Sequence, residues 1–160
     1  MHVYPRFAMS PLPSQRVAHD LAARLRDAYW AMHRLADSHL ERHDITADQF
    51  VLLAALADED GLAQPELCRR TSSNPSAMPA LLGRLETRGF IVREQYAADH
   101  RARCVKLTPH GRHAFAELWA YSEPFRALLV ADFTPREAET LAALLARVPE
   151  AMRRAAAVID

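Results

Sequence analysis

The stretch from Gln64 to Thr108 most constrains how this chain folds, because several local signals follow one another there in a fixed order. A short helical segment over 64–71 precedes a Ser/Asn/Pro break, a longer helical segment that ends at Gly89, and two β-rich runs. Short helix, tight turn, longer helix and hairpin in this order predict a winged helix-turn-helix. We therefore expect a mainly α fold with a small β-hairpin wing.

Helical patterns flank this stretch on both sides. The expected organisation is an N-terminal arm over 1–13, a long helix over 14–43, the winged helix-turn-helix over 44–108, and C-terminal helices over 109–160. The long apolar stripe of the first helix needs more cover than one small domain provides. We expect this helix and the C-terminal helices to form a dimerisation module, so that a two-fold homodimer presents two recognition helices.

The boundaries of the expected helices follow from turn and capping residues. Asn74 and Pro75 are typical of a helix start and Gly89 of a helix end, so the fourth helix is predicted over 75–88. The other helices are expected to begin at Ser14, Thr46, Pro65, Pro109 and Pro135, and the helix after Pro109 to carry apolar positions through Phe125. The hairpin strands are predicted over 91–96 and 103–107, with Asp99, His100 and Arg101 in the link between them.

The fourth helix is the expected reader of the major groove of double-stranded DNA. Its apolar positions Met78, Leu81, Leu82 and Leu85 predict a buried face, which leaves Ser76, Ala77, Pro79, Ala80 and Arg84 toward the groove. Alanine and proline offer only apolar contacts, so we expect modest base readout and a larger share from phosphates and DNA shape. The full set of predicted DNA contacts is Gln64, Ser73, Asn74, Ser76, Ala77, Ala80, Arg84, Arg101 and Arg103.

The wing carries two further expectations. Arg101, at the tip of the hairpin, is predicted to enter a narrow minor groove, where the negative potential is enhanced. Asp99 is expected to orient Arg101 or Arg103, since a carboxylate facing phosphate is repelled.

The charge distribution agrees with this interpretation, although the formal net charge is zero. Residues 61–113 hold nine basic and four acidic side chains, a net charge of +5, and the remaining residues carry −5. Phosphate binding depends on where charge lies rather than on its total.

Other classes of protein are disfavoured. The apolar runs are far shorter than a membrane span, and no charged and apolar leader opens the chain, so a cytoplasmic protein is expected. With four glycines and no nucleophile or phosphate-binding motif, we expect neither an enzyme nor a cofactor. Cys68 and Cys104 form no C-x-x-C pair, and no metal site is predicted.

The wing and the helix after it carry a specific pattern, in which Asp99-His100-Arg101 is followed by Leu107-Thr108-Pro109-His110-Gly111. This pattern is similar to the D-x-R wing and the L-T-x-x-G helix start of the MarR family of bacterial transcriptional regulators, which the chain resembles over roughly residues 21–148. Further likenesses lie at 45–50, 64–67, 85–90 and 133–137. The resemblance implies a homodimeric repressor that binds a pseudo-palindromic operator and releases it when an effector is sensed. Pro79 departs from the family pattern and is expected to kink or delay the recognition helix.

Three kinds of signal remain open for such a regulator. A small aromatic or anionic effector would be held by residues such as Tyr29, Trp30 and His33. The histidines at 33, 39, 43, 110 and 113 leave metal sensing as an alternative, although helix-end and interface histidines are the commoner explanation. Cys68 beside two arginines leaves oxidant sensing as another, although inert cysteines are the preferred interpretation. A winged helix that binds protein partners without DNA is a further alternative, because its recognition helix is largely apolar.

Overall fold

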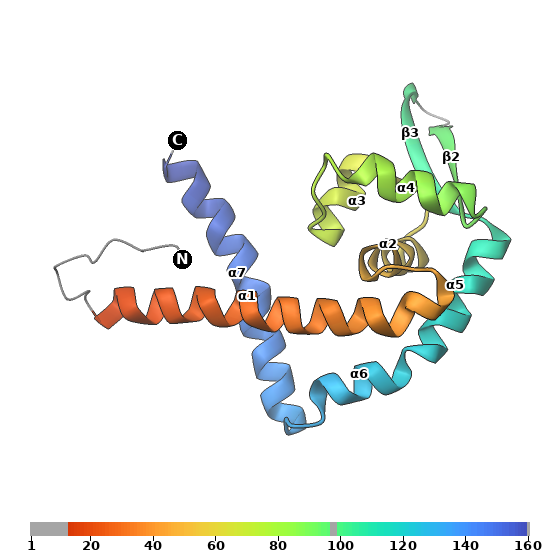
Figure 1. The fold of residues 1–160 in the computed structure, drawn as a ribbon. Helices are drawn as coiled ribbons and strands as arrows, with labels where there is room; N and C mark the ends of the chain where they lie inside the picture. Colours follow the sequence, from red (N-terminus) through yellow and green to blue (C-terminus); the bar gives the residue numbers. More distant parts are fainter. Residues whose placement is uncertain (1–12, 97–98, 160) are drawn as a thin grey trace, which may run out of the picture. The chain divides into compact units, whose positions relative to one another are not determined.

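The computed structural model describes residues 13–96 and 99–159, and within them the side chains of 16–94 and 104–157. The chain forms two compact units, the first ending at Ala47 and the second beginning at Asp48. Figure 1 labels their helices and strands. Residues 1–12 of the expected arm lie outside the described part.

The first unit consists of the long helix α1 (Pro13–Leu40) and the 3-10 turn η1 (Glu41–His43). The expected helix over 14–43 is therefore present, with its last turn tightened. Asp44 then adopts a left-handed conformation with φ of 55°. The amide of Ala47 donates to Oδ1 of Asp37 over 2.7 Å, so a side chain of α1 satisfies one of the amides that a helix start leaves without an intrahelical partner.

The second unit contains the helix-turn-helix and its wing. Helix α2 (Ala47–Asp58) leads into the short strand β1 (Leu62–Ala63), followed by α3 (Gln64–Thr71) and α4 (Met78–Thr87). The hairpin strands are β2 (Ile91–Tyr96) and β3 (Asp99–Leu107). The core of this unit lies where these elements meet. Among the side chains that the structure describes, the largest of those almost completely buried are Leu52, Leu53, Leu56, Leu67, Met78, Leu82, Leu85, Ile91 and Val105.

The sheet has three strands, whereas two were predicted. The strand order is β1-β3-β2 and both pairings are antiparallel. The two residues of β1 pair with Val105 and Cys104, so the wing is anchored to the segment just before α3. Two residues are too few to show an alternating pattern, so the sequence could not predict this strand, which is defined by its pairing with β3.

The predicted start of the recognition helix was wrong by three residues, since α4 begins at Met78. A helix starting at Pro75 would need the amide of residue 79 to bond the carbonyl of residue 75, and Pro79 has no N–H. Residues 75–77 form a turn instead, and Pro79 lies in the first turn of α4, where proline is tolerated. Pro79 therefore delays the helix.

Helix α4 ends at Thr87, one residue before the predicted end at Arg88, and Gly89 follows as the predicted C′ residue. Gly89 has φ of 68°, its amide donates to Glu86 over 2.8 Å, and the amide of Phe90 donates to Leu85 over 3.0 Å. These two bonds make a Schellman motif, which turns the chain out of α4 and into β2.

A close backbone approach joins the hairpin to the next helix. Thr108 caps α5 (Pro109–Tyr121) by accepting from the amide of Gly111 over 2.9 Å, and the amide of Thr108 donates to the carbonyl of Phe90 over 3.0 Å. A Cβ at position 111 would lie 1.9 Å from the carbonyl oxygen of Phe90, so only glycine fits there. The structure thus explains the glycine of the L-T-x-x-G pattern.

The C-terminal part holds two more helices. Helix α5 was expected to carry apolar positions through Phe125, but it ends at Tyr121, and α6 (Glu123–Val130) begins after Ser122. Pro124 is the physical reason, because it lacks the amide that would bond the carbonyl of Ala120. Helix α7 (Pro135–Ile159) opens as predicted, with the hydroxyl of Thr134 and the carboxylate of Glu137 in a reciprocal capping box.

Candidate nucleic-acid interface

The turn between α3 and α4 is held by its own polar side chains. Ser72 adopts a left-handed conformation, and its neighbour Ser73 shares a 2.7 Å hydrogen bond with the hydroxyl of Thr71. Oδ1 of Asn74 accepts from both the amide and the hydroxyl of Ser76, over 3.0 and 2.8 Å. Asn74 therefore caps a turn rather than a helix. The residue itself is exposed.

The outer face of α4 agrees with the sequence prediction. Met78, Leu82 and Leu85 are completely buried, while Leu81, expected in the core, is half-buried. The predicted groove-facing residues are all exposed: Ser76, Ala77, Pro79, Ala80 and Arg84. Among the described residues, the guanidinium of Arg84 has no ion-pair or hydrogen-bond partner.

The two arginines of α3 are less available than their positions in the sequence suggest. Glu66 accepts hydrogen bonds from Arg69 over 2.6 and 2.9 Å and from Arg70 over 2.7 Å. These hydrogen bonds lower the pKa of Glu66 from 4.5 to about 2, so the carboxylate stays ionised in mildly acidic solution. Arg70 also bonds Glu59 over 2.5 Å. Acidic partners thus offset the charge of the last turn of α3.

Three further cations of the basic segment also have acidic partners. Arg93 pairs with Glu86, Lys106 with Glu94 over 2.8 Å, and Arg112 with Asp60 over 2.7 Å. Arg88 lies 4.6 Å from the ring centroid of Phe90. Of the described cations between residues 61 and 113, Arg84 is therefore the one whose charge no acidic or aromatic neighbour engages. Counting charges in the sequence missed this. Pairs such as Arg112 with Asp60 depend on tertiary neighbours, whereas the pairs of Glu66 have the i,i+3 and i,i+4 spacing of a helix, which the sequence does show.

For the predicted wing residues, the structure describes the backbone and not the side chains. Asp99, Arg101 and Arg103 lie in β3, with Asp99 opposite Tyr96 and Arg103 opposite Gln95. The prediction that Asp99 and Arg101 lie in the link was therefore wrong, because β3 begins at Asp99 and the link is shorter. The side chains of all three lie outside the described residues, as does any contact between Asp99 and the arginines.

The predicted effector residues lie together on α1 in the first unit. Tyr29 and Trp30 have ring centroids 5.3 Å apart, and His33 lies 5.3 Å from the first and 5.8 Å from the second. Nδ1 of His33 is 3.2 Å from Oδ2 of Asp37. Tyr29 and Trp30 are each about half exposed. Three adjoining rings thus lie on α1.

The histidines and cysteines bear on the metal and thiol alternatives. Within residues 13–96 and 99–159, no group of three or more His, Cys, Asp and Glu side chains is placed to hold a metal ion. Cys104 is buried in β3 and Cys68 is partly buried in α3, and both are free thiols.

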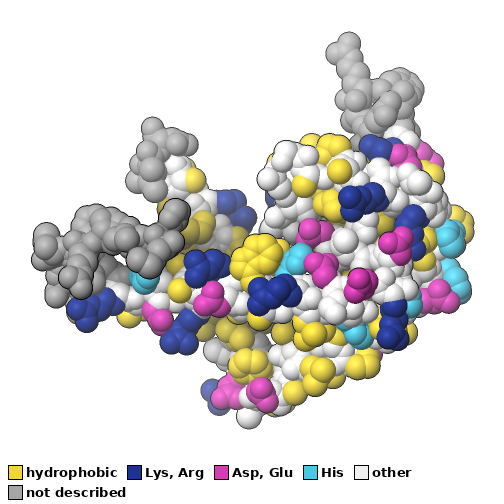
Figure 2. Space-filling model, in the orientation of Figure 1, with side chains coloured by type: hydrophobic (Ala, Val, Ile, Leu, Met, Phe, Trp, Pro, Cys, Tyr) yellow, Lys and Arg dark blue, Asp and Glu magenta, His cyan; other side chains and the backbone are white. Residues whose placement is uncertain are grey.

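Large apolar side chains are exposed along the helices outside the winged domain. They include Val17, Leu21 and Leu35 on α1, Leu128 and Leu129 on α6, and Leu141, Leu144, Leu145 and Met152 on α7. Figure 2 shows apolar side chains gathered on the lower face, where α6 lies in Figure 1. Exposed apolar surface on this scale marks an interaction site. None of the described helices is both long enough and apolar enough to cross a membrane.

Comparison with known proteins identifies relatives. A sequence profile described as the MarR family matches residues 43–102. The transcriptional regulator HosA of Escherichia coli is 33% identical over 94 residues, which cover 56% of this chain and 70% of HosA.

Solved structures agree with the profile. A mutant MarR of Escherichia coli in complex with operator DNA has a TM-score of 0.74 and 26% identity, covering 87% of this chain and 99% of that one. BpsR of Bordetella bronchiseptica has a TM-score of 0.73 and 25% identity, and the match covers 81% of this chain and 98% of BpsR. The DNA binding of BpsR is regulated by 6-hydroxynicotinic acid.

Proposed function

Because this chain belongs to the MarR family of winged helix-turn-helix transcriptional regulators, we propose that it is a cytoplasmic homodimeric repressor of a pseudo-palindromic operator. A small aromatic or anionic effector releases it from the DNA. The observation that carries the proposal is the exposed face of α4, whose Arg84 is unpaired among the described residues, next to the hairpin that bears Arg101 and Arg103.

The proposed contacts divide into two kinds. Arg84, Arg101 and Arg103 supply charge for phosphates or for a narrow minor groove, together with polar groups on Gln64, Ser73, Asn74 and Ser76. Ala77 and Ala80 offer close approach and contact with thymine methyl groups. Because most other cations of the segment are paired internally, we expect few strong phosphate contacts per protomer.

The exposed apolar faces of α1, α6 and α7 support the homodimer. Each carries large side chains that a monomer leaves in water, and burial of apolar area is the main favourable term in most protein association. Two protomers related by a two-fold axis would present two α4 helices to two half-sites.

The ring cluster Tyr29, Trp30 and His33 supports the effector part of the proposal. Aromatic side chains with a few polar groups suit a planar organic ligand, and His33 adds such a polar group. The regulation of BpsR by 6-hydroxynicotinic acid is one example among similar proteins of a ligand of this chemistry.

The decisive test titrates the full chain against the intergenic DNA upstream of its own gene at two salt concentrations. We expect salt-sensitive binding that Arg84→Ala and Arg101→Ala each weaken. Arg136→Ala is the matched control, since it removes one exposed charge from the first turn of α7. Equal losses in all three variants would mean that only net charge matters. No binding by the folded dimer would favour the protein-interaction alternative.

A further inference from the structure

The bend between α5 and α6 is held by one arginine that does not belong to the proposed DNA or effector contacts. Nη1 of Arg126 donates to the carbonyl of Trp119 over 2.8 Å, and its guanidinium carbon lies 3.9 Å from the centroid of the Trp119 ring. Nη2 bonds the carboxylate of Glu123. The side chain of Arg126 is 26% exposed although it carries a full charge.

These contacts supply hydrogen-bond donors to the end of α5, where the helix is interrupted. Pro124 cannot continue α5, so the last carbonyls of that helix need donors from elsewhere. The carbonyl of Leu118 accepts from the amide and the hydroxyl of Ser122, over 2.9 and 2.8 Å. The carbonyl of Trp119 accepts from Arg126, and a cation at this end of α5 is also favoured by the helix dipole.

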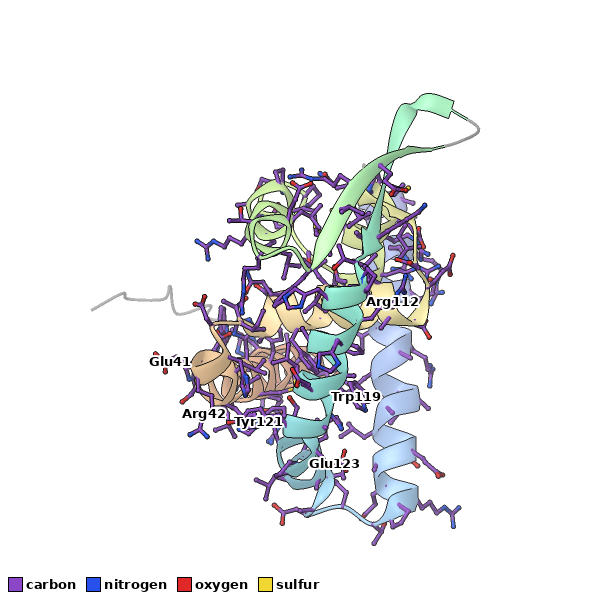
Figure 3. The ribbon with its side chains drawn as sticks, turned by 90° about the vertical axis from the view of Figure 1, so that its right-hand side faces the viewer. Glu41, Arg42, Arg112, Trp119, Tyr121 and Glu123 are labelled. Carbon is purple, nitrogen blue, oxygen red and sulfur yellow. The ribbon has the colours of Figure 1, made fainter. Side chains whose placement is uncertain are left out.

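Trp119 connects this bend to the helix-turn-helix. Its ring is stacked with Phe50 of α2, with centroids 6.2 Å apart and planes 5° from parallel, and it also contacts Phe115. Figure 3 labels Trp119 near the end of α5 and Glu123 at the start of α6. Phe50, Trp119 and Arg126 therefore form a continuous chain of contacts from α2 through α5 to α6.

We propose that the contact of Arg126 with Trp119 fixes the angle between the winged domain and the helices that follow it, and so fixes the separation of the two recognition helices. This inference rests on the proposed homodimer on DNA. Arg126 is a positioning residue in this role. One base pair of extra spacing moves a half-site by about 3.4 Å and about 34° along the duplex, so a loosened bend would relax the choice of operator spacing.

Three variants isolate the contact. Arg126→Ala removes both the ring contact and the bond to the Trp119 carbonyl, and Trp119→Leu removes only the ring. Glu123→Gln is the matched control, because it removes the ion pair, whose Glu123 side chain is 70% exposed, and leaves Arg126 against Trp119. Circular dichroism and sedimentation first establish that each variant is folded and dimeric.

The first readout needs no DNA. A nitroxide on Gly83→Cys, in a Cys68→Ser background, reports the distance between the two α4 helices by pulsed electron paramagnetic resonance. Nothing lies within 4 Å of a Cβ at position 83, and Cys104 is buried. We expect a narrow distance distribution for the unsubstituted bend and for Glu123→Gln, and a broad one for Arg126→Ala and Trp119→Leu.

The second readout is the affinity for the footprinted upstream operator against versions with one base pair inserted or removed at its centre. We expect Arg126→Ala to lose preference for the native spacing by about fivefold, the scale of a partly desolvated cation–π contact. A folded, dimeric Arg126→Ala with an unchanged distance distribution and spacing preference overturns the inference. A parent protein that dimerises without binding DNA overturns the proposed function, while the distance result still decides the role of the bend.

Discussion

At the scale of single residues, Gly111 is the one of the four glycines at which an added Cβ has no room. It is buried, and an added Cβ would collide with the carbonyl of Phe90. We predict that Gly111→Ala lowers the free energy of unfolding by about 3 kcal/mol, since the overlap is with backbone that cannot rotate away. Urea unfolding followed by circular dichroism measures the change.

Gly83 provides the comparison for that experiment. It lies inside α4, and no atom is within 4 Å of the place that an added Cβ would take. Gly83→Ala should therefore raise stability by up to about 1 kcal/mol through helix propensity alone. Equal destabilisation by both substitutions would show that the contact with Phe90 is not the cause.

Glu66 gives the molecule a pH dependence with a definite sign. Its folded pKa of about 2 lies below its usual value of 4.5, so the group stabilises the fold above 4.5, and the contribution is lost as the pH falls toward 2. We predict that Glu66→Gln melts at a lower temperature than the parent near neutral pH and that the difference shrinks through this window. Thermal melts across the pH range measure it.

Glu139→Gln is a control for this effect, because it removes an exposed carboxylate of α7 that has no ion pair within the described residues. Its melting difference from the parent, measured over the pH window set by the shift of Glu66, is the baseline for the loss of one α7 carboxylate. A Glu66→Gln difference that stays constant over the same range would contradict the assignment of the shift to Arg69 and Arg70.

At the scale of elements, proline decides where two helices begin. Pro79 delays α4 to Met78, and Pro124 separates α6 from α5. Pro79→Ala restores the missing amide, and we predict that α4 then extends toward Pro75. Hydrogen exchange followed by NMR would show a protected amide at position 79. An unprotected amide there would mean that the Asn74 turn, rather than Pro79, sets the start.

The capping box of α7 makes a second prediction at this scale. Thr134→Ala removes the hydroxyl that bonds Glu137, and we expect a loss of about 1 kcal/mol in the free energy of unfolding. Thr140→Ala, which removes a hydroxyl bonded to the Arg136 carbonyl within the helix, should cost less. Equal costs would argue against a capping role.

At the scale of the whole molecule, the distribution of charge determines how DNA binding responds to salt. If Arg84 neutralises a phosphate in each half-site, Arg84→Ala reduces the slope of log affinity against log salt by about two for a dimer. Fluorescence anisotropy at several salt concentrations measures the slope. An unchanged slope with weaker binding would indicate that Arg84 contacts a base instead.

The exposed apolar faces make the corresponding prediction for assembly. Leu144→Gln on α7 should weaken the homodimer, whereas Val51→Gln on α2, at a residue of similar exposure, should not. Sedimentation equilibrium gives both dissociation constants. A monomeric parent protein would remove the basis of the proposed two-fold operator.

The amino-acid sequence by itself determined the helix-turn-helix, its buried leucines, the cap at Thr108 and the end of α4 at Gly89. These features depend on neighbours within a few residues, so apolar periodicity and turn chemistry are enough to predict them. The late start of α4 at Pro79 and the break between α5 and α6 at Pro124 also have local causes, since a proline without an amide can be read from the sequence.

Only the tertiary structure decided which charges remain free for DNA. Asp60 and Arg112 are 52 residues apart, and β1 exists because β3 lies beside it. The collision that requires Gly111 and the contact of Arg126 with Trp119 likewise depend on how separate segments approach one another. Distances between residues that are remote in the chain are set by packing, and no local pattern encodes them.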